Sequence, residues 1–229
     1  MSGAFQVELA TLSARDRYKL LCALVVPRPI ALVTTLGPGG IVNAAPFSFF
    51  NVFSEDPPII ALGLYGRPEG GLKDTSANIR NIGFFVVNLI DEALAARMNI
   101  CAVDFPSHIS ELDAADFTPF PSAAIPVPRI AEAVAAFECR HYQTLYLSPH
   151  RHLCLGEVTH VHARAGIVDP ANLYVDLNAY KPVARLFGNL YAGLKQAFEL
   201  KRQTYADWLA AGGEREDRAK RHSSNNAEP

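Results

Sequence analysis

Ile30-Ala-Leu-Val-Thr-Thr-Leu-Gly-Pro-Gly-Gly-Ile-Val-Asn-Ala-Ala45 is the stretch that decides the fold. Residues 30–36 are rich in apolar and β-branched side chains, as in a buried strand. Gly37-Pro-Gly-Gly40 is a strong turn signal, and residues 41–45 return as a second strand. The stretch therefore predicts an antiparallel β-hairpin.

Further strands follow the hairpin, and turn signals separate most of them. We expect these strands at 59–65, 84–90, 137–147 and 152–165. Helices are predicted at 14–24, at 75–81 after a cap at Asp74, from Asp91 to about 102, and at 198–211. Few helices remain to cover two faces of a sheet. The content is mainly β with helical additions, which favours a closed antiparallel β-barrel over a doubly wound sheet.

The chain of 229 residues suits one domain with elaborations. We expect a single domain over residues 1–211 and a polar, disordered tail over 212–229. Residues 103–128 contain five prolines. This segment is predicted to be a long surface excursion with one helical turn near 109–114. Loops of this length are often lids or interface arms.

Composition excludes several function classes. Hydrophobic residues make up 49% and charged residues 19%, and the formal net charge is −2. This balance argues against a nucleic-acid-binding surface or a basic membrane patch. The sequence shows neither a secretory leader nor the roughly twenty apolar residues of a membrane helix. We therefore expect a soluble cytoplasmic protein.

Cysteines and histidines give no clear metal signature. The four cysteines lack metal-ligand spacing and fit reduced, buried thiols: Cys22, Cys101, Cys139 and Cys154. His160 and His162 would point the same way on a strand, which leaves a metal site as one interpretation. Histidines on a half-exposed strand are the favoured interpretation, so no metal is expected.

Lys73-Asp-Thr75 lies where a helix is predicted to begin. The first turn of a helix presents unpaired amides and a partial positive charge, which together bind anions. Lys73 would add a charge, Thr75 a hydroxyl, and Arg67 in the preceding glycine-rich loop a second cation. The alternative is that Asp74 only caps the helix and Lys73 is solvated. If the helix start binds an anion, Lys73, Thr75 and Arg67 predict a phosphate site.

Asn43-Ala-Ala-Pro-Phe-Ser-Phe-Phe-Asn51 overlaps the second strand of the hairpin. Aromatic triplets usually pack in a core. A core strand does not normally carry amides and a hydroxyl between its aromatic residues unless those polar groups have partners. The mixture suits a flat ring with a polar edge. With a phosphate site at Lys73, it favours a phosphorylated planar cofactor, for which flavin mononucleotide (FMN) fits best.

Several motifs together resemble one family. They are Pro27-Arg-Pro-Ile-Ala-Leu-Val-Thr-Thr35, Asn43–Asn51, Asp56-Pro-Pro58, Lys73-Asp-Thr75 with Asn78-Ile79, Phe85-Val-Val-Asn88, Leu155-Gly-Glu-Val158 and Arg185-Leu-x-Gly-x-x-Tyr191. Between about residues 18 and 200 the chain resembles the flavin reductase-like family of FMN-binding split barrels, in the branch that includes flavoredoxin-like proteins.

The resemblance implies a closed antiparallel split β-barrel that binds FMN near the interface of a homodimer. It implies that the isoalloxazine ring lies along Ala45, Pro46, Phe47, Ser48 and Asn51, beside Asn43. It places the phosphate near Lys73, Asp74 and Thr75, and it adds Arg185 and Tyr191 to the pocket. Leu186-Phe-Gly188 departs from a frequent glycine pair and would bring a bulky ring near the flavin.

A flavin supplies its own redox chemistry, so the sequence needs no acid–base triad and identifies no catalytic residue. The leading hypothesis is hydride transfer from NADH or NADPH to the flavin, and then to free flavin, a partner oxygenase or another small-molecule acceptor. One alternative is a flavin carrier or storage protein without turnover. Another is a flavin-dependent oxygenase that acts on a small organic molecule.

Overall fold

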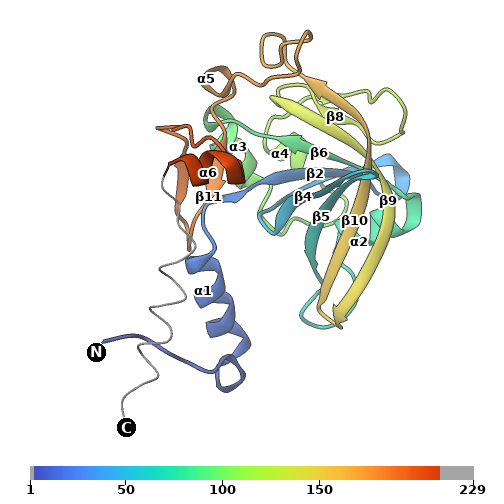
Figure 1. Cartoon of the computed structure of the whole chain (residues 1–229). Coiled ribbons are helices and arrows are strands. Elements are labelled where there is room, and N and C mark those ends of the chain that lie inside the picture. Colours follow the sequence, from blue (N-terminus) through green and yellow to red (C-terminus); the bar gives the residue numbers. More distant parts are fainter. Residues whose placement is uncertain (1–2, 212–229) are drawn as a thin grey trace. The chain divides into compact units, whose positions relative to one another are not determined.

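The computed structural model describes residues 3–211, so the predicted tail 212–229 lies outside the described part. The chain divides into two compact units, Met1–Leu194 and Lys195–Pro229. Antiparallel strands dominate the first unit and short helices accompany them, which confirms the expected mainly β content (Figure 1). One domain extending to residue 211 stays a prediction.

A seven-stranded sheet forms the body of the first unit, in the order β3-β2-β6-β9-β10-β5-β4. Its neighbouring strands are all antiparallel. The strands are β2 (Ala31–Leu36), β3 (Val42–Phe47), β4 (Phe50–Glu55), β5 (Pro58–Tyr65), β6 (Phe84–Leu89), β9 (Ala135–Ser148) and β10 (Arg151–Ala163). The predicted hairpin is confirmed, because β2 pairs with β3 and Val33 lies opposite Ala45.

The sheet is expected to close into a barrel, but its backbone hydrogen bonds leave it open. Strands β3 and β4 are its two edges, and no ladder joins them within residues 3–211. They are consecutive in the chain and meet at a bend formed by Ser48 and Phe49. Pro46 of β3 has no N–H to donate, so β3 is suited to an edge. The backbone bend, and not a ladder, connects the two edges.

Two smaller sheets complete the strands. β1 (Arg28–Pro29), β11 (Val183–Arg185) and β12 (Tyr191–Gly193) form a three-stranded sheet in the order β1-β11-β12. β7 (Pro119–Phe120) pairs with β8 (Arg129–Ile130). The first of these sheets brings the start of the fold beside residues more than 150 positions later, as the pair Pro29 and Ala184 shows.

The early helices follow the sequence closely. Helix α1 (Ala14–Leu24) has the predicted bounds, and the Ser13 side chain caps it by accepting from the Asp16 amide. Helix α2 (Asp74–Ile82) ends at Gly83 with φ 78°, a left-handed conformation that glycine adopts without a Cβ penalty. The predicted Asp74 cap is wrong. Lys73 occupies the N-cap position, and the Asp74 carboxylate accepts instead from Arg67 at 2.8 Å.

The predicted excursion 103–128 contributes to the core. It follows a 3₁₀ turn, Glu92–Leu94, capped by Asp91 as expected, and α3 (Ala95–Ile100), and it contains α4 (Glu111–Ala114). Several of its apolar side chains are buried, among them Leu112, Phe117, Ile125 and Val127. The expectation of a surface excursion is therefore wrong in part, because its prolines shape a segment that packs against the sheet.

The remaining helices are short. They are α5 (Leu177–Tyr180) in the first unit and α6 (Tyr205–Ala210) in the second. The predicted helix 198–211 begins only after Thr204. There the Thr204 side chain accepts from the Asp207 amide, and Asp207 accepts from the Thr204 amide. This capping box fixes the helix start at that point.

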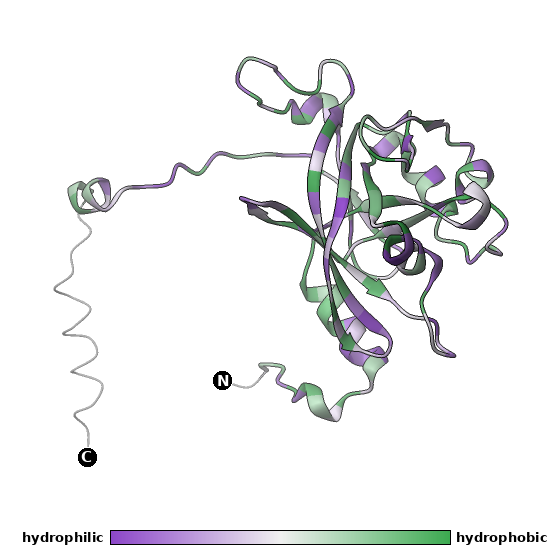
Figure 2. Ribbon diagram, turned by 90° about the vertical axis from the view of Figure 1, so that its right-hand side faces the viewer, coloured by the Kyte–Doolittle hydropathy of each residue, from purple (hydrophilic) through white to green (hydrophobic). Residues whose placement is uncertain are grey.

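The long strands β9 and β10 carry both hydrophobic and hydrophilic residues along their length (Figure 2). Glu138 of β9 is fully buried and accepts from the amides of Ala123 and Ala124, at 2.5 and 2.9 Å. It also contacts Nε2 of His162 at 2.6 Å, whereas the ring of His160 contacts Thr159. Glu138 thus ties the segment before β8 to the face of the sheet.

Burial alone would raise the pKa of Glu138, but the hydrogen bonds from Ala123, His162 and Ala124 lower it below its ordinary value of 4.5. We predict that Glu138→Gln lowers the free energy of unfolding by about 1–3 kcal/mol at neutral pH, because the NH2 group of glutamine cannot accept and one of the two backbone N–H donors loses its acceptor. A group whose pKa is lowered by folding stabilises the fold at pH values above its unfolded-state pKa. This contribution is lost as the pH falls through the folded-state pKa.

Urea denaturation at a series of pH values should therefore show the difference between parent and variant narrowing below about pH 4. Glu157→Gln is the matched control. Within residues 3–211 the ion-pair partner of Glu157 is the exposed Arg140, so this variant should lose little stability. Equal losses in the two variants, or a difference that does not depend on pH, would contradict the assignment.

Candidate functional site

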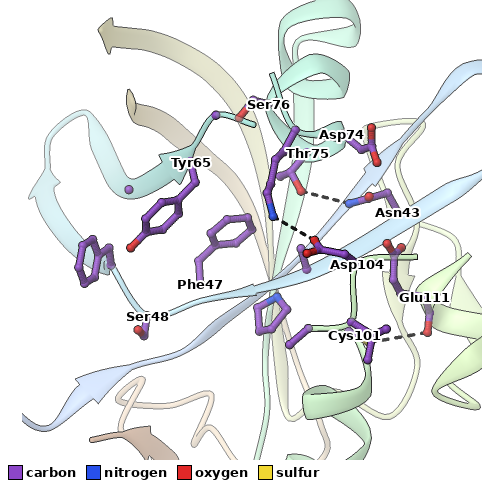
Figure 3. Close-up of a pocket in the computed structure, with 18 of the residues that line it drawn as sticks. Asn43, Phe47, Ser48, Tyr65, Asp74, Thr75, Ser76, Cys101, Asp104 and Glu111 are labelled. Carbon is purple, nitrogen blue, oxygen red and sulfur yellow. Dashed lines mark hydrogen bonds and ion pairs between the residues drawn. The ribbon is translucent and has the colours of Figure 1, made fainter. Parts of the chain in front are cut away.

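A cavity of about 1110 Å³ lies where β3, the end of β5, the start of α2 and the segment after α3 meet (Figure 3). Eleven of the twelve predicted site residues line it: Asn43, Ala45, Pro46, Phe47, Ser48, Arg67, Lys73, Asp74, Thr75, Arg185 and Tyr191. Pockets for drug-sized ligands are about 300–1000 Å³. The cavity therefore has room for a large planar ligand with a second molecule beside it.

Asn51 is the predicted residue that the fold does not bring to this cavity. It lies on β4, beyond the bend at Ser48 and Phe49, and is exposed. Its side-chain oxygen accepts from the Val52 amide at 2.8 Å. The bend redirects the chain, so spacing along the sequence does not carry over to the cavity wall.

One end of the cavity is lined by aromatic side chains. Phe47 packs against the core of the sheet, and it gathers with Ser48 and Tyr65 at this end (Figure 3). The rings of Tyr18, Phe49 and Tyr65 form a row, with centroids 6.2 and 6.1 Å apart. Such a wall suits a planar aromatic ring with a polar rim.

Gly63 is required beneath this row. A Cβ at Gly63 would lie 2.7 Å from the Cβ of Phe49, closer than real Cβ atoms approach. The Gly63 amide also donates to the Phe49 carbonyl at 2.7 Å. Glycine thus allows Phe49 to approach β5, where it contributes to the aromatic wall.

The other end of the cavity is polar and is formed by the first turn of α2. Thr75 and Ser76 are buried there, 4% and 8% exposed. Thr75 Oγ1 accepts from the Asn43 amide group at 3.1 Å, which leaves its hydroxyl proton free to donate. Ser76 Oγ has no hydrogen-bond partner in the described part of the chain.

An unpaired buried hydroxyl costs about 1–3 kcal/mol and is rare in native structures. The first turn of this nine-residue helix provides the hydroxyls of Thr75 and Ser76 and its free backbone amides as donors. A phosphate is the group that such a set fits. The residues present are therefore compatible with the phosphate end of FMN.

The charged side chains around this end form exposed ion pairs, in which a ligand can replace one partner. Lys73 Nζ contacts Asp104 at 3.0 Å, and the Asp104 side chain is 92% exposed. Arg67 contacts Asp74 at 2.8 Å, with both side chains partly exposed. Exposed ion pairs contribute little free energy. A phosphate dianion, which makes stronger charge-assisted bonds, can replace Asp104 as the partner of Lys73.

Two lining groups that the sequence analysis did not place at the site are Glu111 and Cys101. The pKa of Glu111 is raised above its ordinary value of 4.5, mainly by burial and also by the charge of Asp74. Hydrogen bonds from the amides of Ala44 and of Glu111 itself act in the opposite direction. Burial, followed by the charge of Glu111, raises the pKa of the Cys101 thiol to about 12. Cys101 is therefore no nucleophile at neutral pH.

Arg185 and Tyr191 form the remaining wall. The Arg185 guanidinium lies over the Tyr191 ring, 4.5 Å from its centroid, and donates to the Tyr191 hydroxyl. That hydroxyl donates in turn to Asn99 at 3.0 Å. Phe187, expected to place a bulky ring near the ligand, is not among the residues lining the cavity and is 42% exposed.

Comparisons with known proteins find similar chains and one matching family model. Residues 23–184 match the model of the flavin reductase like domain. The uncharacterized protein YwrF of Bacillus subtilis (strain 168) is 42% identical over 196 residues, 83% of this chain and 95% of that protein.

Within residues 3–211 no helix is both long and apolar enough to cross a membrane.

Solved structures give the same result. Nitrilotriacetate monooxygenase component B from Bacillus cereus has a TM-score of 0.83 and 33% identity, covering 87% of this chain and 100% of that one. The 2-nitrobenzoate 2-nitroreductase NbaA of Pseudomonas fluorescens has a TM-score of 0.81 and 37% identity, covering 88% and 98%. Flavoredoxins share the fold. The chain belongs to the flavin reductase-like family of split-barrel proteins.

Proposed function

We propose that this chain is an FMN-dependent oxidoreductase that takes a hydride from NADH or NADPH and passes two electrons to an acceptor. The observation that carries the proposal is the buried, unpartnered hydroxyl of Ser76 at the start of α2. It lies at the polar end of a cavity whose other end is lined by aromatic side chains. FMN combines a phosphate group with a planar aromatic ring, so each end of the cavity would meet the part of FMN that suits it.

The residues bind and orient, while bound FMN supplies the redox chemistry. Lys73, Thr75 and Ser76 hold the phosphate. Ala45, Pro46 and Phe47 support one face of the ring. Residues 103–106, which also line the cavity, limit water at the ring and form its variable wall. Space beyond that needed for FMN admits the nicotinamide ring at stacking distance.

The acceptor has two candidate classes, each favoured by a similar protein. Nitrilotriacetate monooxygenase component B is one part of an oxygenase system, which favours free reduced flavin delivered to a partner oxygenase. NbaA is a nitroreductase, which favours a nitroaromatic acceptor in this cavity. A cytoplasmic homodimer with flavin near its interface belongs to the same proposal. A carrier without turnover and an internal oxygenase are the competing functions.

Purified protein mixed with FMN should oxidise NADH or NADPH, followed by loss of absorbance in the nicotinamide band. The expectation rests on room for two stacked rings in one cavity. Bound FMN that only a strong chemical reductant bleaches would favour the carrier. A hydroxylated organic product that forms under air with the chain alone would favour the oxygenase.

Lys73→Ala should weaken FMN binding about tenfold to a hundredfold, or about 1.5–3 kcal/mol, because a charge-assisted phosphate contact is lost. Riboflavin, which lacks the phosphate, should bind the parent and the variant alike. Quenching of flavin fluorescence measures both affinities. Asp104→Ala is the matched control, since it removes the competing partner of Lys73 and should leave FMN affinity equal or higher. Unchanged FMN binding by Lys73→Ala would refute the phosphate assignment.

Ser76→Ala separates binding from folding. The substitution removes a buried hydroxyl without a protein partner, so the ligand-free chain should unfold at the same or a higher temperature. FMN affinity should fall about tenfold, as one hydrogen bond from a hydroxyl to the charged phosphate is lost. Thermal unfolding with and without FMN measures both effects. A variant that destabilises the ligand-free chain and binds FMN normally would show that Ser76 has a purely structural role.

A further inference from the structure

Arg28 is a buried arginine that the proposed function does not use; it does not line the cavity but contacts Ser48, which does. It lies on β1 and is 7% exposed. Its NH1 donates to the carbonyls of Cys22 and Val25 at 2.6 and 2.8 Å, and its NH2 donates to the carbonyl of Leu186 at 2.8 Å. No carboxylate lies within ion-pair distance of it among residues 3–211.

This arrangement satisfies the donors of Arg28 but leaves its charge without an ionic partner. Arginine stays protonated in proteins, and a buried charge is normally paired. Two of the three carbonyls belong to the end of α1, where the helix dipole is negative and equivalent to about half a charge. The dipole compensates the cation in part, so a net positive field remains near the cavity.

Ser48 connects this cation to the cavity. Arg28 Nε makes a long contact with Ser48 Oγ, 3.4 Å. Arginine can only donate, so the Ser48 oxygen accepts in this contact and its own proton stays available. No acceptor for that proton is present in the described residues. Ser48 lines the aromatic end of the cavity with Phe47 (Figure 3).

We propose that Arg28 is a positioning residue that fixes the Ser48 hydroxyl as a donor toward a flavin ring, and that the pair stabilises the reduced flavin over the oxidised one. The inference rests on the proposed function. Reduction adds negative charge to the polar edge of the ring, and preorganised donors are most effective where charge develops. A nearby cation acts in the same direction.

A purely structural Arg28 would behave differently. It joins the end of α1, the bend between β3 and β4, and the loop between β11 and β12. If that were its whole role, its removal would lower stability and would not change the preference for reduced flavin. The decisive readout is therefore the midpoint potential of bound FMN, because the potential reports the ratio of the affinities for the reduced and oxidised forms.

The experiment measures the midpoint potential of FMN bound to the full chain, together with thermal unfolding, for Arg28→Met, Arg28→Lys and Ser48→Ala. Arg140→Met is the matched control, since it removes one exposed arginine that contacts Glu157 and does not line the cavity. Arg28→Met should lower the ratio of the affinity for reduced flavin to the affinity for oxidised flavin about tenfold. This lowers the midpoint potential by about 30 mV for a two-electron couple. Ser48→Ala should lower the affinity ratio about threefold.

Arg28→Lys keeps the charge and should stay closer to the parent than Arg28→Met, and Arg140→Met should match the parent. Potentials of Arg28→Met and Ser48→Ala equal to that of Arg140→Met would overturn the inference, whatever their stability. If Arg28→Met does not fold, Ser48→Ala decides alone, and an unchanged potential overturns it. A parent that binds no FMN would overturn the proposed function and this inference with it, whereas a parent that binds FMN isolates the inference.

Discussion

The hairpin of β2 and β3 is the constraint on which the rest of the structure depends. It holds Asn43 at one end of a single strand and Ser48 just beyond the other. At the first end, Asn43 donates to Thr75, and Asn78 of α2 donates to Thr35 of β2 at 3.0 Å, so the start of the helix is fixed against the hairpin. At the second end, Ser48 contacts the buried Arg28. The length of one strand thus sets the separation between the polar end and the aromatic end of the cavity.

Burial keeps this strand in place while the cavity beside it stays open. Leu32, Val33 and Ala44 are fully buried on the hairpin, and the amide of Ala44 donates to the buried Glu111 at 2.9 Å. The opposite wall is formed by exposed ion pairs that exchange at small cost. A rigid strand faced by an adaptable rim is the arrangement expected where a ligand must enter and leave.

Local pattern in the sequence predicts most of the elements and the parts of the cavity wall that lie on them, because strand alternation, glycine turns and helix caps are short-range signals. The hairpin, α1 and the 43–48 and 73–75 segments are of this kind. What the sequence does not reveal depends on long-range contacts. Arg67 takes the carboxylate of Asp74, the bend after Ser48 turns Asn51 away, and Glu111 becomes buried from within a proline-rich segment. Arg28 meets Leu186 across 158 positions, which no local pattern encodes.

The central claim is that the polar end of the cavity binds the phosphate of FMN. Titration of the parent chain with FMN and with riboflavin, followed by flavin fluorescence, tests it most directly, because the two ligands share the ring and differ in the phosphate. The account predicts that FMN binds at least about tenfold more tightly, a difference of about 1.4 kcal/mol, and that added inorganic phosphate competes with FMN and not with riboflavin. Equal affinities for the two ligands would contradict it.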